Sequence, residues 1–259
     1  MKKMVVVAVL ALGLVLMSMP VLALPLGTNI TIDDENTHDG EWYGNYEDNE
    51  VEWHSVANQS WDLEGFFLDG TTLSMVGGWD FVSGQSGYTS GDVFIDVDGV
   101  DFTSSVADDY GYDYAFDVNW SEGTYTLNKL AGSTYSNTTY VRDSNPWRYK
   151  SNETQVGSGT FSTDTLTEAE ATALGLAGDG YGQSYSNVHN VVSFDLLPIL
   201  VDLGVSKIDF TSHFTMECGN DNLMGHGAAP VPEPQTLLLM GIGLLGLAFV
   251  GRKKLGERA

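Results

Sequence analysis

Cysteine is almost absent from this 259-residue chain, in which Cys218 stands alone. No disulfide can therefore form within the chain, and a hydrophobic core has to hold the fold. Roughly 200 residues lie between the two apolar ends, which is enough to bury such a core without covalent links. Cys218 falls on the apolar side of an alternating segment, so we expect a small buried core residue rather than a nucleophile.

Basic residues are also scarce. Eleven Lys and Arg stand against 35 Asp and Glu, which gives a formal net charge of −24. Six of the eleven lie near the two ends of the chain: Lys2, Lys3, Arg252, Lys253, Lys254 and Arg258. A body this acidic argues against nucleic acid as a partner, because Lys and Arg are the residues that neutralise phosphates. It suits solubility outside the cell, divalent cations or cationic matrix components, and a merely well-solvated surface explains the same charge.

Long apolar runs occur only at the two ends. At the N-terminus a short basic start precedes an apolar run over residues 5–17. Val21-Leu22-Ala23 then presents small or tolerated residues at the positions that a signal peptidase reads. The pattern predicts a secretory signal peptide over residues 1–23. Pro20 and the small-residue site favour cleavage after Ala23 over an uncleaved anchor.

At the C-terminus three features follow one another. Pro232, Glu233 and Pro234 come first, an uncharged Leu- and Gly-rich run over residues 237–250 follows, and Arg252, Lys253 and Lys254 close the series. The prolines keep the entry out of a helical hydrogen-bond ladder. The uncharged run can bury its whole circumference in hydrocarbon, and the basic cluster marks the cytoplasmic end. Residues 255–259 would then form a short cytoplasmic tail.

This tripeptide, apolar run and basic cluster resemble a PEP-CTERM sorting segment, which is also described as the C-terminal domain of ice-binding proteins. The resemblance implies export across the inner membrane and recognition of the Pro-Glu-Pro tripeptide by an exosortase-type membrane protease. It also implies that the C-terminal helix holds the chain in the membrane until the tail is removed, and that the protein then reaches the cell surface or the medium. A permanent single-pass anchor is the alternative. A helix over residues 235–250 would span only about 24 Å of a hydrocarbon core of about 30 Å, which favours a removable signal.

Alternating and β-rich segments dominate the part between the ends. Residues 112–120 alternate aromatic or apolar side chains with mostly polar ones, which is the period of a strand. Ser121-Glu122-Gly123 then turns the chain into a partner strand over residues 124–130, and Asp69-Gly70 is a second hairpin signal. Further strands are expected over residues 63–68, 71–76, 79–82, 93–97, 191–197 and 208–218.

These segments predict a mainly β fold, an antiparallel β-sandwich or jelly-roll-like domain over residues 24–224 with one short helix. Thr167 caps that helix, and Glu170 completes a capping box three residues later. The small residues over 225–231 are predicted to form a flexible spacer. The sorting motif, transmembrane helix and basic cluster occupy residues 232–254.

The sequence carries few signs of chemistry. It has neither a His-Glu-x-x-His zinc pair nor a Gly-x-Ser-x-Gly elbow. Paired carboxylates of the kind that hydrolyse glycosides stay open, because acids are so numerous. Asp96, Asp98 and Asp101 stand around a glycine turn, and hard oxygen ligands on a tight turn suit calcium. Their spacing departs from the EF-hand pattern, and a solvated Asp-Gly hairpin turn explains the same residues.

We therefore expect an exported cell-surface or extracellular-matrix protein with a non-enzymatic role, either structural or polysaccharide-binding. A secreted carbohydrate-active enzyme on the same scaffold is the alternative. Ice binding is suggested only by the other description of the tail. It would need a flat, regular Thr-rich face, and Thr-x-Thr does not recur at a regular interval along the sequence.

Overall fold

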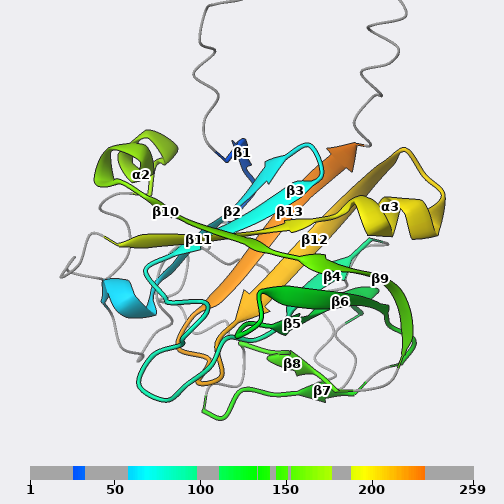
Figure 1. Cartoon of the computed structure of the whole chain (residues 1–259), viewed down its shortest axis with the longest axis horizontal. Helices are drawn as coiled ribbons and strands as arrows, with labels where there is room; N and C mark the ends of the chain where they lie inside the picture. Colours follow the sequence, from blue (N-terminus) through cyan, green and yellow to red (C-terminus); the bar gives the residue numbers. More distant parts are fainter. Residues whose placement is uncertain are drawn as a thin grey trace, which may run out of the picture.

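A computed structural model describes residues 26–32, 58–97, 111–132, 134–140, 144–150, 153–176 and 188–230 (Figure 1). Within these ranges no helix is both long and apolar enough to cross a membrane. The predicted signal peptide, the expected calcium ligands Asp98 and Asp101, and the whole segment from residue 231 to the C-terminus lie outside the described residues. The secondary structure and the metal site assigned to these segments therefore remain predictions.

The described chain forms two large antiparallel sheets. The first, with strand order β1-β2-β3-β11-β10, contains β1 (Thr28–Asn29), β2 (Leu63–Asp69), β3 (Thr72–Gly77), β11 (His189–Asp195) and β10 (Ser162–Leu166). The second, with order β13-β12-β4-β5-β6-β9, contains β13 (Asn222–Pro230), β12 (Lys207–Thr215), β4 (Val93–Asp96), β5 (Tyr114–Asn119), β6 (Thr124–Lys129) and β9 (Thr154–Thr160). Every pairing between these strands is antiparallel. The mainly β, antiparallel prediction is confirmed.

Shorter elements surround the two sheets. β7 (Tyr135–Ser136) and β8 (Arg148–Tyr149) form a small two-stranded sheet. A 3-10 turn, η1 (Gln59–Trp61), precedes β2, while α2 (Glu168–Leu174) follows β10 and α3 (Leu197–Leu203) follows β11. In Figure 1 the two sheets are stacked, with β7 and β8 beyond the second sheet.

One large core fills the space between the sheets. Phe66 and Leu73 from the first sheet and Phe116 and Phe214 from the second are all inaccessible to solvent and belong to the same cluster. Phe194 of β11 meets the ring of Phe116 with centroids 5.3 Å apart. Side chains that alternate along a strand reach the opposite sheet, so this packing is what closes a sandwich. Two smaller clusters cover the outer faces of the sheets.

The local signals in the sequence place the turns well. Gly70, in the β2–β3 turn, has a φ of +60°, and Gly123, in the β5–β6 turn, has a φ of +69°. Glycine adopts this left-handed region without a Cβ clash, which is why both hairpins turn there. At α2 the Thr167 hydroxyl accepts from the Glu170 amide at 3.3 Å, and the Glu170 carboxylate accepts from the Thr167 amide at 2.8 Å. The predicted hairpins and capping box are confirmed.

The predicted flexible spacer over residues 225–231 is wrong as far as Pro230. These residues form the second half of β13, which pairs with β12 over its whole length from Lys207↔Pro230 to Thr215↔Asn222. Small residues are required there because the first sheet packs close. A Cβ added to Gly225 would lie 2.8 Å from the Phe66 Cβ. The glycines that suggested a linker therefore permit close packing of the two sheets.

Two further predictions need correction. Residues 79–82, expected to be a strand, form a turn in which the Trp79 indole is buried and its Nε1 donates to Ser90 Oγ at 2.8 Å. The prediction of one short helix missed α3, whose first residue, Leu197, was included in the strand predicted over residues 191–197. Pro198 stands at the start of α3, where a missing backbone N–H costs nothing, and Gly204 ends the helix at a φ of +66°.

Candidate functional site

The outer face of the second sheet carries rows of polar side chains. Asp117 of β5 lies opposite Thr126 of β6, and Thr126 lies opposite Ser158 of β9. Two residues along, Asn119, Thr124 and Thr160 form the next row. Residues directly opposite one another on neighbouring strands share a face, so these carboxylate, amide and hydroxyl groups all point away from the core. Hydroxyl-rich β6 and β9 therefore give this face an array of hydrogen-bond donors and acceptors.

A hollow of about 880 Å³ lies over these rows. Its floor is formed by the polar residues of β5, β6 and β9, and Arg148 of β8 lines it as well. At its far end the lining continues onto Val82, Thr89 and Ser90, in the segment that leads into β4. We call this hollow the β8 groove.

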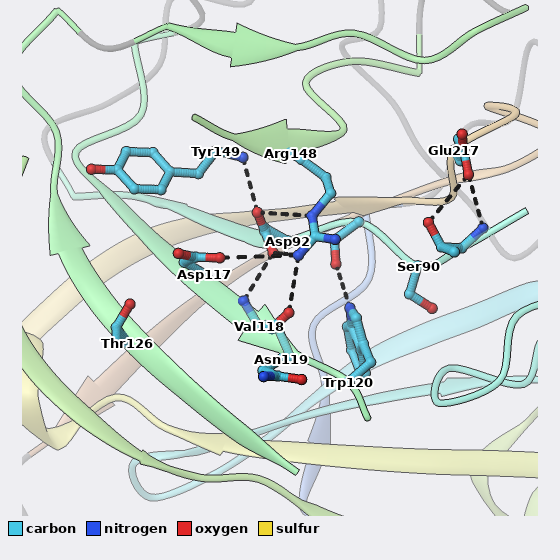
Figure 2. Close-up of polar contacts among 12 residues, drawn as sticks. Ser90, Asp92, Asp117, Val118, Asn119, Trp120, Thr126, Arg148, Tyr149 and Glu217 are labelled. Atoms are coloured by element: carbon cyan, nitrogen blue, oxygen red, sulfur yellow. Dashed lines mark hydrogen bonds and ion pairs between the residues drawn. The ribbon is translucent and has the colours of Figure 1, made fainter. Parts of the chain in front are cut away.

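A fully buried carboxylate fixes the Arg148 side chain (Figure 2). Asp92 precedes β4 and has no exposed surface. Arg148 Nη2 and Nε lie 3.4 and 3.5 Å from the two Asp92 oxygens, and Nη2 also donates to the Val118 carbonyl at 3.0 Å. Asp117 Oδ1 stands 4.0 Å from the same Nη2. The Arg148 side chain is about one third exposed, so it is held in place while still lining the groove.

Asp92 also joins three strands through backbone contacts. The Val118 amide of β5 and the Tyr149 amide of β8 each donate to its carboxylate at 2.9 Å. Burial raises the pKa of Asp92 from 3.8 to about 6, while Arg148 and the two amides act in the opposite direction. The acceptor sites of this carboxylate are thus taken up by protein donors, and its role is to hold β8 against β4 and β5.

Gly91, just before Asp92, allows this close approach. A Cβ at this position would lie 2.4 Å from the Trp147 carbonyl oxygen and 2.5 Å from that of Thr215. The Gly91 carbonyl in turn accepts from Trp120 Nε1 at 2.9 Å (Figure 2). The end of the groove near Trp120 is therefore built on backbone contacts that tolerate no side chain at residue 91.

An aromatic pair involves Tyr88, the residue before the groove residue Thr89. Tyr140 is 74 % exposed, and its ring meets that of Tyr88 edge-on with centroids 5.9 Å apart. The next residue, Thr89, lines the groove and is fixed by Glu217, whose carboxylate accepts from the Thr89 amide at 3.1 Å. The exposed Tyr140 side chain offers both an apolar ring face and a hydroxyl.

The expected calcium ligands are only partly within the described residues. Asp96 is the last residue of β4 and is buried, while Asp98 and Asp101 lie outside. Among the described side chains, no three His, Cys, Asp or Glu residues gather as they would around a metal ion. Calcium at this turn therefore stays a prediction. From the same acidic stretch, the structure brings Asp92 and Asp117 together around Arg148.

Arg148 is the residue of the candidate site that sequence reasoning missed. The sequence patterns described above give this residue no role. The available signal was the scarcity of positive charge, since Arg148 is one of few basic residues away from the ends of the chain. Cys218, expected to be a core residue, is indeed buried within the main core, and burial raises the pKa of its thiol.

A second buried polar cluster lies on the first sheet. His189 Nδ1 is 2.8 Å from both carboxylate oxygens of Glu64, and the Gln59 amide donates to the same carboxylate. Glu64 sits at a register shift in β2, and hydrogen bonding to it raises the pKa of His189. Both side chains are almost fully buried and satisfy one another. This cluster ties η1 and β11 to β2.

His213 provides a test of the layer that covers the second sheet. Its ring is 1 % exposed, stacks on Tyr112 with centroids 5.7 Å apart, and Nε2 donates to the Pro146 carbonyl at 3.0 Å. Burial lowers the pKa of His213 from 6.5 to about 4. The folded chain thus favours the neutral ring, so the contribution to stability is complete above pH 6.5 and is lost as the pH falls through about 4.

We therefore expect His213 alone to lower the free energy of unfolding by about 3 kcal/mol between pH 6.5 and pH 4. In chemical denaturation at a series of pH values, His213→Gln should lack this part of the acid slope. His226→Gln removes an exposed histidine from neighbouring β13 and serves as the matched control. Equal slopes for the wild type and His213→Gln would contradict the burial of a neutral ring.

Comparison with known families bears on the end of the chain. A family model described as the PEP-CTERM protein-sorting motif matches residues 230–254. The chain carries a PEP-CTERM sorting motif. The match begins at Pro230, the last residue of β13, so the PEP-CTERM segment starts where the sheet ends. The motif implies exosortase-type sorting, with export and membrane anchoring before processing and a location at the cell surface afterwards. No curated protein and no solved structure matches the chain.

Proposed function

We propose that the β domain is a non-enzymatic binding domain of an exported cell-surface or extracellular-matrix protein, and that it holds neutral polysaccharide in the β8 groove. The observation that carries the proposal is the pair of polar rows across β5, β6 and β9, which lie in an open hollow beside a fixed arginine. Sugar hydroxyls both donate and accept hydrogen bonds. A floor of hydroxyl, amide and carboxylate groups meets both needs.

The charge of the groove supports a neutral ligand. Arg148 is the only basic residue in the lining, and it lies between the carboxylates of Asp92 and Asp117. An anionic polymer would gain little from a guanidinium whose charge is already offset, and it would meet the field of a chain with a net charge of −24.

Affinity electrophoresis of the purified protein through gels that contain neutral, uronate-containing or amino-sugar polysaccharides tests the proposal. Asp117→Ala and Thr126→Ala each remove one acceptor or hydroxyl from the floor, and each should weaken binding to the retarding polymer by about tenfold. Thr163→Ala, in exposed β10 of the other sheet, is the control for a lost hydroxyl. Retardation that is the same in the floor variants as in Thr163→Ala would contradict the proposal.

A secreted carbohydrate-active enzyme is the second candidate. What favours it is a carboxyl with a pKa near 6, Asp92, close to a half-exposed carboxylate, Asp117. The complete burial of Asp92 weighs against it, since a general acid has to reach the glycosidic oxygen. New reducing ends released from a retarding polysaccharide, and lost in Asp117→Asn, would establish the enzyme and overturn the binding role.

A further inference from the structure

Exposed apolar side chains gather at one place in the described part of the chain. The described ranges contain six exposed large hydrophobic residues, and three of these six fall within five consecutive positions of the sequence. Val201 is 70 % exposed, Val205 is 42 % exposed and Leu203 is 36 % exposed. Single exposed apolar residues are ordinary, but three within five positions of an acidic chain indicate an interaction site. We call these three residues the α3 patch.

The orientation of α3 is fixed, so the patch is a property of the fold. Ile199 and Leu200 point into the main core, and Pro198 packs against Gly157 of β9. The Asp202 carboxylate also accepts from the hydroxyl of the core residue Tyr114 at 2.8 Å and from Lys129 Nζ at 3.0 Å. These contacts leave Val201 and Leu203 no place in the core.

The patch lies at the end of the sandwich where the chain leaves the sheet. Val205 is two residues before Lys207, and Lys207 lies directly opposite Pro230, the last residue of β13. Figure 1 shows the turn from α3 into β12 and the tip of β13 at the same end of the molecule. The sorting motif begins at this same Pro230.

We propose that the α3 patch rests on the lipid surface of the membrane while the C-terminal segment still anchors the chain. The proposal rests on the anchoring that the sorting motif implies and is independent of polysaccharide binding. Seven residue steps separate Pro230 from Leu237, where the apolar run begins, so the tether is at most about 25 Å long. So short a tether gives a high effective concentration, and even weak burial of three aliphatic side chains then suffices.

Site-directed fluorescence on the full-length chain tests this. The chain is reconstituted through its own C-terminal segment into vesicles of phosphatidylcholine, whose zero net charge avoids repulsion of the acidic chain. An environment-sensitive fluorophore is attached at Val201→Cys or Val205→Cys. Buried Cys218 is the only native thiol, and the unsubstituted chain taken through the same labelling gives the background. Lipids that carry a nitroxide near the head group should quench both patch positions at least about twofold more than a distant site, because interfacial side chains lie at the depth of the nitroxide.

Two controls separate contact from proximity. Val188→Cys changes the same residue type, 44 % exposed, just before β11 at the end remote from α3. Asp209→Cys lies opposite Ala228, two residues before the tether begins at Pro230, on a 73 % exposed side chain outside the patch. Quenching at Val201 and Val205 above both controls supports the proposal.

Three outcomes would overturn it. Equal quenching at Asp209 and the patch positions would mean that the tether alone brings this end near the bilayer. Patch signals that match Val188 would mean that the surface stays in water. A blue shift that grows with the protein-to-lipid ratio, without nitroxide quenching, would assign the patch to a second copy of the chain.

Discussion

Replacing Asp92 by alanine should lower the free energy of unfolding at pH 7 by about 3–5 kcal/mol, which is a drop in Tm of about 10 °C for a domain of this size. The side chain accepts from the amides of Val118 and Tyr149 and from the Arg148 guanidinium, and alanine accepts from none of them. Arg148 keeps some contact with water, so most of the cost comes from the two amides left without an acceptor. Thermal unfolding followed by circular dichroism measures the effect.

Asp92→Asn is the informative partner of this variant, because it keeps the shape and one acceptor oxygen but cannot ionise. The pKa of Asp92 is raised to about 6 in the fold, above its ordinary value of 3.8. A raised pKa means that the stability contributed is complete below about pH 3.8 and is lost as the pH rises through about 6. The advantage of wild type over Asp92→Asn should therefore shrink by about 2.5 kcal/mol between pH 4 and pH 7.

Wild type and Asp92→Asn have to be compared at each pH, because a second buried group titrates over the same range. Over the same range His213 acts with the opposite sign, since its folded-state pKa is lowered to about 4 and its contribution grows as the pH rises. The two groups partly cancel in the wild-type curve. A difference between wild type and Asp92→Asn that stays constant from pH 4 to pH 7 would contradict the burial of an ionisable carboxyl at this position.

The parts of the fold that sequence reasoning recovered are those set by local chemistry. The β5–β6 hairpin follows from nine alternating positions and a glycine that can take a positive φ, and the α2 capping box from Thr167 and Glu170 alone. Such features depend on residues a few positions apart. Their physics is therefore visible in the sequence.

The features that were missed depend on what a distant segment places alongside. Glycines in residues 225–230 looked like a linker, yet Gly225 is small because Phe66, far earlier in the chain, packs on it. Likewise β12 was expected to bury one face, but His213 on the other face is covered by Pro146 and Tyr112. No pattern within either strand carries that information.

The same reason explains the candidate site. The site combines Asp92, just before β4, with Asp117 of β5 and Arg148 of β8. Only the tertiary fold brings the arginine to 3.4 Å from the buried Asp92 carboxylate. The sequence did show that acids gather between residues 92 and 117. It could not show which of them faces a cation, because that depends on the path of the chain between β6 and β9. The sorting motif is the opposite case, since its three parts lie in order along the chain and were identified directly.

Phe194→Ala should be as damaging as the loss of Asp92, at about 3–5 kcal/mol. The Phe194 ring is 1 % exposed and stands among four other aromatic rings of the core: Phe116, Trp120, Tyr125 and Phe161, at centroid distances of 5.3, 6.3, 5.7 and 5.7 Å. Three of these rings lie in the β5–β6 hairpin of the facing sheet: Phe116 on β5, Tyr125 on β6 and Trp120 in the turn between them. Truncation would thus open a cavity between the two sheets, and rigid rings on paired strands cannot collapse into it.

Phe67→Ala is the matched control, because Phe67 is equally buried but lies on the other face of the first sheet. It packs in a small cluster with Ala171 and Leu176, at and just after a seven-residue helix. A short helix held by few buried contacts can shift toward the space that a truncated side chain leaves, so the cavity penalty should be smaller there. We expect guanidinium denaturation to give a larger loss for Phe194→Ala than for Phe67→Ala. The reverse order would mean that the contact between the sheets is not the main source of stability.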